Sequence, residues 1–291
     1  MFDGFELEFV DVGEAVLRVR RGGSGPPVLL LHGHPQTHAM WNRVAPLLAR
    51  EFTVVAPDLR GYGESSKPPT DARHEPYSKR AMARDHVELM RGFGFERFAV
   101  AGHDRGGRCA YRMALDHPDR VEKLAVLDIV PTAEMWRRVD MEFGMVDWHW
   151  FFLAQPAPLP EELLGANPEA YYFRRDRSKF DPEALEDYLR CARNLETIHA
   201  MCEDYRAGAT IDRELDEADR GKRRIACPLL VLWSGREELG RWFDVLEVWR
   251  RWADDVRGRP LDCGHYLAEE APDDVYAELR GFFAGSAAAA E

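Results

Sequence analysis

Residues 102–107 read G-H-D-R-G-G and lie between a short apolar run and a helical pattern. The glycines on both sides of Asp104 permit a sharp strand-to-helix turn with a strained backbone at its centre. The spacing matches G-x-nucleophile-x-G, in which such a turn exposes the central side chain. The alternative is an ordinary glycine-rich turn in which Asp104 only caps the helix. The pattern makes Asp104 the candidate nucleophile.

Short apolar runs on both sides of this turn predict buried strands. Four are apolar and rich in branched residues, as parallel strands buried on both faces are: Pro27–Leu31, Phe52–Pro57, Phe98–Gly102 and Leu124–Ile129. Phe5–Val12 and Ala15–Arg20 alternate apolar and polar residues, which is typical of half-buried antiparallel strands. Helical patterns such as Lys79–Phe93 and Gly107–His117 separate the runs. We therefore predict an α/β fold with a mostly parallel twisted sheet flanked by helices.

The pattern changes near Pro131. Residues 131–218 show helical periodicity, many aromatic side chains and several Pro breaks, but no convincing strand. Within them, the acidic run Asp212–Asp219 is expected to be a solvated helix face. Strand patterns return at Pro228–Trp233 and Asp255–Leu261, before a last amphipathic helix at Pro272–Phe283. We expect a core formed by residues 1–130 and 219–291, interrupted by a helical cap at 131–218.

Composition excludes several classes of function. The chain has 291 residues, 39 of them basic and 51 acidic, for a formal net charge of −12. This charge argues against general binding of nucleic acid, which needs a basic face, and against docking on anionic membranes. No apolar run approaches the roughly 18 residues of a membrane span, and the N-terminus does not read as a signal peptide. Five cysteines without a C-x-x-C pair disfavour a disulfide scaffold or zinc site, so we expect a cytoplasmic protein.

Two histidine-bearing segments fit a catalytic site around Asp104. L-H-G-H-P-Q at residues 31–36 follows an early strand, and D-C-G-H at residues 262–265 precedes the last helix. His265 therefore completes the chain order nucleophile, acid, histidine. A simple turn and a surface histidine are the alternative interpretations of the two segments.

Two segments of the chain offer candidates for the acid. Asp128 ends the strand predicted at 124–129, whereas Glu237 and Glu238 follow the strand predicted at 228–233. We favour Asp128 because it lies directly at the carboxyl end of its strand. Helix capping is its alternative role.

Together with D-L-R-G-Y-G-E-S-S-K-P at residues 58–68, these motifs resemble the α/β-hydrolase superfamily over nearly the whole chain. The resemblance implies that the backbone N–H groups of His34 and Arg105 form the oxyanion hole. With Asp104 as nucleophile, it points to haloalkane dehalogenases, soluble epoxide hydrolases and haloacetate (fluoroacetate) dehalogenases. His34 departs from the aromatic residue usual there, and is expected to alter pH dependence or pocket shape.

An aspartate nucleophile indicates substitution at an alkyl carbon. Attack on an acyl carbon would give a mixed anhydride, whereas attack on an sp³ carbon gives an alkyl ester and expels a leaving group. His265 would then activate the water that hydrolyses the Asp104 ester, and Asp128 would orient His265. No metal or organic cofactor is required.

Arg105 and Arg108 flank the nucleophile at a helix N-terminus and can converge on one anion. Because arginine matches a carboxylate bidentately, and because the chain is acidic overall, this pair indicates an anionic substrate. The alternative is that the two arginines only lower the pKa of Asp104 or pair with surface acids.

The run H-D-R-G-G-R at residues 103–108 resembles the fluoroacetate dehalogenases closely. The resemblance implies that Arg105 and Arg108 hold the substrate carboxylate and that the halide is bound by His149, Trp150 and Tyr205. All three side chains are hydrogen-bond donors. An aromatic cap core is the alternative for His149 and Trp150, and Tyr171, Tyr172 and Tyr188 are alternatives to Tyr205. The resemblance also implies a homodimer.

The expected reaction is hydrolytic dehalogenation of a short 2-haloacid, in which a haloacetate and water give glycolate and halide. An epoxide hydrolase that uses the same nucleophile is the first alternative, with Tyr205 and a second cap tyrosine as acids. A non-catalytic receptor for a small acid is the other, and it would tolerate the loss of His265.

Overall fold

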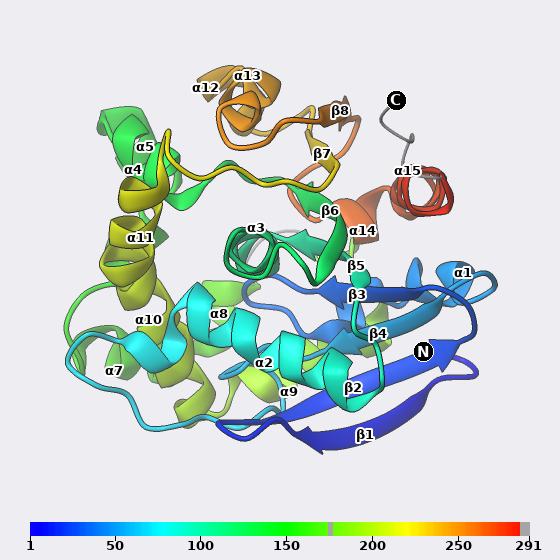
Figure 1. Ribbon diagram of the computed structural model, residues 1–291. Helices are drawn as coiled ribbons and strands as arrows, with labels where there is room; N and C mark the ends of the chain where they lie inside the picture. The colour runs from blue at the N-terminus through cyan, green and yellow to red at the C-terminus, as the bar shows by residue number, and fades with distance from the viewer. Residues whose placement is uncertain (174–176, 286–291) are drawn as a thin grey trace.

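The computed structural model describes residues 1–173 and 177–285, which contain an eight-stranded sheet of order β1-β2-β4-β3-β5-β6-β7-β8 (Figure 1). β1 pairs with β2, and β2 with β4, in antiparallel fashion, while the other neighbours are parallel. The mostly parallel sheet is thus confirmed. The strands are β1 (Glu6–Asp11), β2 (Val16–Gly23), β3 (Pro27–Leu31), β4 (Thr53–Pro57), β5 (Phe98–His103), β6 (Val121–Leu127), β7 (Leu229–Ser234) and β8 (Val256–Leu261).

Helices on both faces explain why the central strands are apolar throughout. Side chains alternate in direction along a strand. Leu29 and Leu31 of β3 therefore pack into one hydrophobic core with α2 and α3, while Val28 and Leu30 pack into a second core with α1 and α15. The core helices are η1 (His38–Trp41), α1 (Ala45–Leu48), η2 (Glu75–Tyr77), α2 (Lys79–Gly92), α3 (Arg105–Asp116), α12 (Leu239–Trp242), α13 (Val245–Arg250), α14 (Leu267–Glu270) and α15 (Pro272–Ala284).

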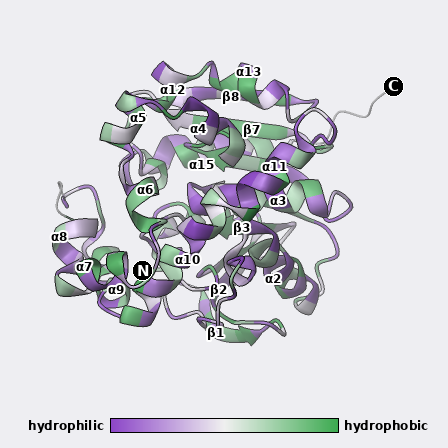
Figure 2. Ribbon diagram, turned by 90° about the vertical axis from the view of Figure 1, so that its left-hand side faces the viewer, coloured by the Kyte–Doolittle hydropathy of each residue, from purple (hydrophilic) through white to green (hydrophobic). Residues whose placement is uncertain are grey.

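Between β6 and β7 the described residues form helices and no strand, and we call these helices the cap helices. They are α4 (Thr132–Arg138), α5 (Met141–Val146), α6 (His149–Leu153), α7 (Leu159–Ala166), α8 (Pro168–Tyr172), α9 (Pro182–Ala192), α10 (Leu195–Ala209) and α11 (Ile211–Asp219). Figure 1 shows α4, α5, α10 and α11 to the left of the sheet. Figure 2, turned by 90°, shows α6 to α9 grouped at the left of its view. Residues 174–176 of the expected cap, and 286–291 of the expected core, lie outside the described residues.

The acidic run of α11 is not the solvated face expected from the sequence, and that prediction was wrong. Asp212, Asp216 and Asp219 are all buried. Arg112 donates to Asp216 at 2.7 Å and to Asp219 at 2.6 Å, and the backbone N–H of Lys79 donates to Asp212 at 2.8 Å. The spacing of three and four residues places the three carboxylates on one side of α11, where they meet partners from the core.

Within the described ranges, every helix is too short or too polar to cross a lipid bilayer.

Candidate active site

Asp104 occupies the turn between β5 and α3. Its φ of 46° lies in the left-handed region, which is strained for a residue with a Cβ atom. Gly102 and Gly106 permit the turn, because a Cβ on either would lie 2.4 Å from a backbone oxygen, that of Gly106 or of His32. Asp104 makes no side-chain cap bond to α3, and its Oδ2 instead accepts the backbone N–H of His34 at 3.0 Å. Asp104 therefore does not act as the helix cap.

The loop after β3 approaches Asp104 closely. A Cβ on Gly33 would lie 2.8 Å from the Cβ of Asp104, so only glycine fits there without a shift. The ring of His34 packs edge-on against Tyr62, Tyr172 and Tyr205. Burial lowers the pKa of His34 to about 3, so the ring is neutral at physiological pH. The ring contributes shape to this wall rather than a titrating charge.

His265 and Asp128 form a direct pair. The Nδ1 of His265 lies 2.6 Å from Oδ2 of Asp128, whose Oδ1 accepts the backbone N–H of Ser234 at 2.8 Å. Burial lowers the pKa of His265, but the hydrogen bond and charge of Asp128, followed by the charge of Asp104, outweigh it and raise the pKa to about 9. Asp128 is thus the carboxylate that holds His265 Nδ1.

Two further residues hold the loop that carries His265. His103 donates from Nε2 to the backbone oxygen of His265 at 2.7 Å. The carboxylate of Glu270 accepts the backbone N–H groups on either side of His265, from Gly264 at 2.9 Å and Tyr266 at 3.1 Å. Sequence reasoning missed both residues, and the one available signal was the position of His103 next to Asp104.

Arg105 and Arg108 are both buried, and each is only partly engaged by the protein. Arg105 donates from Nε and Nη2 to Asp204 at 2.9 and 2.7 Å, and Arg108 donates from Nη1 to Val130 O at 3.1 Å and to Thr132 Oγ1 at 3.2 Å. Within the described residues, Nη1 of Arg105 and Nε of Arg108 have no partner. Pairing with surface acids, the alternative weighed above, does not occur here, since Asp204 is fully buried.

The charges around Asp104 keep it ionised. Burial alone would raise its pKa. His265, His103, Arg108 and Arg105 have the opposite effect, and together they hold the pKa well below the ordinary value for aspartate. A carboxylate, rather than a carboxylic acid, is the form that can attack an alkyl carbon.

The cap places three aromatic side chains beside the two arginines. The Tyr205 ring centroid lies 5.7 Å from that of His149 and 6.2 Å from that of Trp150. The guanidinium carbon of Arg105 lies 4.3 Å from the Tyr205 centroid, and that of Arg108 lies 4.6 Å from the Trp150 centroid. Burial lowers the pKa of His149 to about 4, so this ring is neutral and keeps one N–H donor. The predicted carboxylate and halide residues therefore share one wall.

Of the alternative tyrosines, Tyr172 contacts the same ring as Tyr205, that of His34, whereas Tyr188 bonds a carboxylate. Tyr188 donates to Glu269 at 2.9 Å, while the Tyr172 ring lies 5.3 Å from that of His34. Trp150 also packs against Phe143 at 6.0 Å between centroids, so it belongs both to the cap core and to the wall of the site.

Asp147 is a further carboxyl group that the sequence did not single out. Its Oδ1 lies 3.9 Å from Nδ1 of His149. Burial raises the pKa of Asp147 to about 6, partly offset by the positive charges of His265 and Arg108. The cap side of the site thus contains a carboxyl group that ionises near neutral pH.

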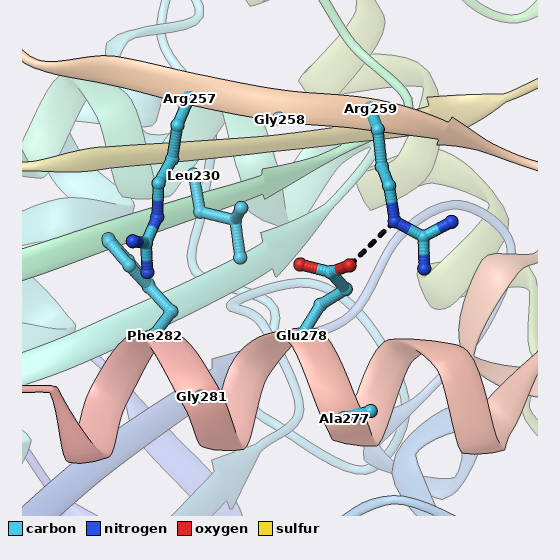
Figure 3. A pocket seen from close by; sticks show the side chains of 8 residues that line it. All are labelled: Leu230, Arg257, Gly258, Arg259, Ala277, Glu278, Gly281 and Phe282. Atoms are coloured by element: carbon cyan, nitrogen blue, oxygen red, sulfur yellow. Dashed lines mark hydrogen bonds and ion pairs between the residues drawn. The ribbon is translucent and has the colours of Figure 1, made fainter.

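A separate surface groove lies between β8 and α15 (Figure 3). Its two arginines are Arg257, which stacks on Phe282, and Arg259, which pairs with Glu278 at 2.6 Å. The groove contains none of the predicted site residues.

Comparison with known proteins agrees with this architecture. The sequence profile of the alpha/beta hydrolase fold matches residues 26–272. A fluoroacetate dehalogenase from Burkholderia sp is 50% identical, covering 97% of this chain and 95% of that protein. A soluble epoxide hydrolase from Corynebacterium sp. (strain C12) is 31% identical, covering 98% and 96%. A crystal structure from Nostoc sp PCC 7120, provisionally described as an alpha/beta hydrolase, is 55% identical with a TM-score of 0.95, covering 97% of this chain and 99% of that one.

Proposed function

This chain belongs to the α/β-hydrolase fold family, and from that premise we propose that it is a haloacetate dehalogenase acting on short 2-haloacids. The observation that carries the proposal is the arrangement around Asp104. Two buried arginines, each with an unpartnered nitrogen among the described residues, adjoin the rings of Tyr205 and Trp150. The ring of His149 lies next to that of Tyr205. A substrate with a carboxylate at one end and a halogen at the other matches both sets of donors. The 50% identity to a fluoroacetate dehalogenase supports the same substrate class.

In the first step, a carboxylate oxygen of Asp104 attacks C2 of the haloacetate as the carbon–halogen bond breaks. The bonding pair leaves with the halide, which accepts hydrogen bonds from His149, Trp150 and Tyr205. Arg105 and Arg108 hold the substrate carboxylate, so C2 is presented to the nucleophile in a fixed orientation. The product of this step is an alkyl ester on Asp104 and a halide ion.

In the second step, His265 takes a proton from water, and the hydroxide attacks the carboxyl carbon of the Asp104 ester. The oxyanion forms on a carboxyl oxygen of Asp104, and the backbone N–H of His34 already lies 3.0 Å from Oδ2. The backbone N–H of Arg105 is the proposed second donor. As the intermediate collapses, the imidazolium of His265 gives its proton to the departing oxygen and glycolate is released. Asp104 loses the remaining proton to solvent and is restored as a carboxylate, with one carboxyl oxygen derived from water. Asp128 stabilises the imidazolium of His265 throughout.

The decisive experiment combines product analysis with a trapped intermediate. The purified protein is expected to release halide and glycolate in equal amounts from chloroacetate and fluoroacetate. The His265→Ala variant should release one equivalent of halide and then stop, with the added mass of a carboxymethyl ester on the peptide that contains Asp104. Absence of halide release by the wild-type protein would refute the proposed activity. Turnover without ester in the variant would refute the covalent route, and no reaction at all in either protein would favour a receptor.

An epoxide hydrolase is the second candidate, and a specific contact favours it. Tyr172 and Tyr205 both pack against the ring of His34, at 5.3 and 5.1 Å between centroids, so two cap tyrosines lie at one wall. The 31% identity to a soluble epoxide hydrolase points the same way. This candidate would be supported if the protein converted a small epoxide to a diol, and if that activity were lost in Tyr205→Phe but retained in Arg108→Gln. Such a result would favour an epoxide hydrolase over a haloacid dehalogenase.

The proposed cap at residues 131–218 and the homodimer follow from the same family. Sedimentation of the purified protein tests the oligomeric state directly, and the cytoplasmic location stays a prediction.

A further inference from the structure

Asp204 engages one edge of Arg105 completely. Its Oδ2 accepts Nε of Arg105 at 2.9 Å, its Oδ1 accepts Nη2 at 2.7 Å, and its backbone oxygen accepts Nη2 at 2.7 Å. Both side chains are at most 1% exposed. The donors of the three bonds are Nε and Nη2 of the guanidinium. Nη1 remains without a partner in the described part of the chain.

Gly208 closes a second side of the same guanidinium. It follows Asp204 by one turn of α10, and a Cβ at this position would lie 3.0 Å from Nη2 and 3.4 Å from Nη1 of Arg105. Because contacts this short require the neighbour to shift, glycine leaves the space that the planar group occupies. Asp204 and Gly208 therefore form a cradle on α10 for Arg105.

The positive and negative charges around Asp204 are equal in number, and Arg108 is not one of them. Asp204 also accepts the hydroxyl of Tyr62 at 2.6 Å and an ion pair from the buried ammonium of Lys79. Lys79 in turn lies 3.8 Å from Asp212, so two cations meet two carboxylates. Arg108, by contrast, bonds a backbone carbonyl and a hydroxyl, and no carboxylate within 4.0 Å is found among the described residues. The two arginines thus differ in what they offer an anion.

We propose that Asp204 is a positioning residue that aims Nη1 of Arg105 at the substrate carboxylate and so sets the preference for haloacids over neutral substrates of the same shape. Arg108, which has no carboxylate within 4.0 Å among the described residues, supplies positive charge, and Arg105 supplies direction. This inference rests on the proposed function, because it concerns the carboxylate side of that site. A residue of a cap helix, Asp204, would thus control the orientation of a residue of the core, Arg105.

The test compares chloroacetate with chloroacetamide, which has a neutral group of similar size in place of the carboxylate. Initial rates of chloride release give kcat/KM for each substrate in wild type and in Asp204→Asn. We expect the acid-to-amide ratio to fall about tenfold or more, because an asparagine side chain cannot accept both N–H groups and Arg105 turns away. A residue that acted only as a counterion would have the opposite effect, since its removal makes the site more positive. An unchanged or higher ratio would overturn the proposal.

Gly208→Ala provides a variant that removes no charge and keeps a helical residue of high propensity. It should displace the guanidinium and lower the same ratio, even if Asp204→Asn folds poorly. Tyr62→Phe is the matched control, because it removes one bond to Asp204 without touching Arg105. This control should leave the ratio within about twofold of wild type, and a fall equal to that of Gly208→Ala would overturn the proposal.

The outcomes separate this inference from the proposed function. A wild-type protein that releases no chloride from chloroacetate contradicts the dehalogenase assignment itself. Turnover by the wild type with an unaltered ratio in both Asp204→Asn and Gly208→Ala contradicts only the role of Asp204.

Discussion

The core and the cap contribute to the same site by different physical means. On the core side, Asp104 and Asp128 follow adjacent parallel strands with φ values of 46° and 58°, and backbone N–H groups hold both carboxylates. On the cap side, His149, Trp150 and Tyr205 project from two helices and are fixed by ring contacts and by the arginine faces. The core half is held by backbone geometry, and the cap half by side-chain packing.

This difference indicates which properties of the enzyme change together. A strand end surrounded by backbone hydrogen bonds has few alternative arrangements, so the positions of Asp104 and His265 are expected to tolerate changes in the cap. Packed rings, in contrast, respond to any change in their neighbours. The chemistry on Asp104 should therefore be robust, while the choice of leaving group should depend on the cap. The following predictions test this separation, in order of expected effect.

The largest effect is expected for the pH dependence of the rates, which should differ between halide release and hydrolysis of the Asp104 ester. The pKa of Asp104 lies well below its ordinary value, so halide release in a single turnover at saturating haloacetate should be independent of pH from about 5 to 9. His265, whose pKa is about 9 in the resting site, must lose its proton before it can act as base. Esterification removes the charge of Asp104 and so lowers this pKa. Glycolate formation should fall about tenfold per pH unit below the lowered value.

Rapid-quench measurements of halide and glycolate at pH 6 and pH 8 check this prediction. A burst of halide ahead of glycolate at pH 6 is expected. Equal slowing of both products would mean that a group other than His265 controls the profile.

A smaller effect is expected at the halide side. Trp150→Phe keeps an aromatic ring against Arg108 but loses the indole N–H donor. Fluoride is the halide that gains most from hydrogen bonds, so kcat/KM for fluoroacetate should fall about tenfold to a hundredfold, and that for bromoacetate much less. Trp242→Phe is the control, because Trp242 packs on the same Phe143 but is not one of the predicted site residues. An equal loss for both substrates in Trp150→Phe would assign Trp150 to packing alone.

For Asp147, the direction of the pH effect on substrate binding can be predicted. Its pKa is raised to about 6, so its carboxyl group is neutral at pH 5 and negative at pH 8. A negative charge beside His149 disfavours an incoming anion. Asp147→Asn should therefore lower KM for chloroacetate about two- to fivefold at pH 8 and leave it unchanged at pH 5. An equal change in KM at both pH values would show that the carboxyl acts through shape and not through charge.

Local motifs allowed the core half to be predicted from the sequence. The turn at residues 102–107 and the position of Asp128 at a strand end each depend on a few neighbouring residues, and the structure places both as expected. The mostly parallel sheet followed from apolar runs that are buried on both faces.

The supporting residues of the site could not be predicted in the same way. Arg105 and Asp204 are separated by 99 residues, and no local pattern marks a buried ion pair that forms only when two distant helices meet. The acids of α11 look solvated in sequence, and they are buried because α11 packs against Lys79 and Arg112 of the core. Tyr205 was distinguished from other cap tyrosines by resemblance, since its role depends on which helix faces the arginines.

The smallest effect on activity is expected at His34, where backbone and side chain have separate roles. The backbone N–H meets Asp104, whereas the ring is neutral and its buried Nδ1 has no partner within the described residues. His34→Phe should therefore change kcat by less than about threefold and leave the pH profile in place. Removing an unsatisfied buried polar atom should also stabilise the fold by about 1 kcal/mol, measured by urea unfolding. A large loss of kcat without loss of stability would mean that the ring of His34, and not only its backbone N–H, contributes to the chemistry. The distinction between a core held by backbone hydrogen bonds and a cap held by side-chain packing would then not hold at His34, where core and cap meet.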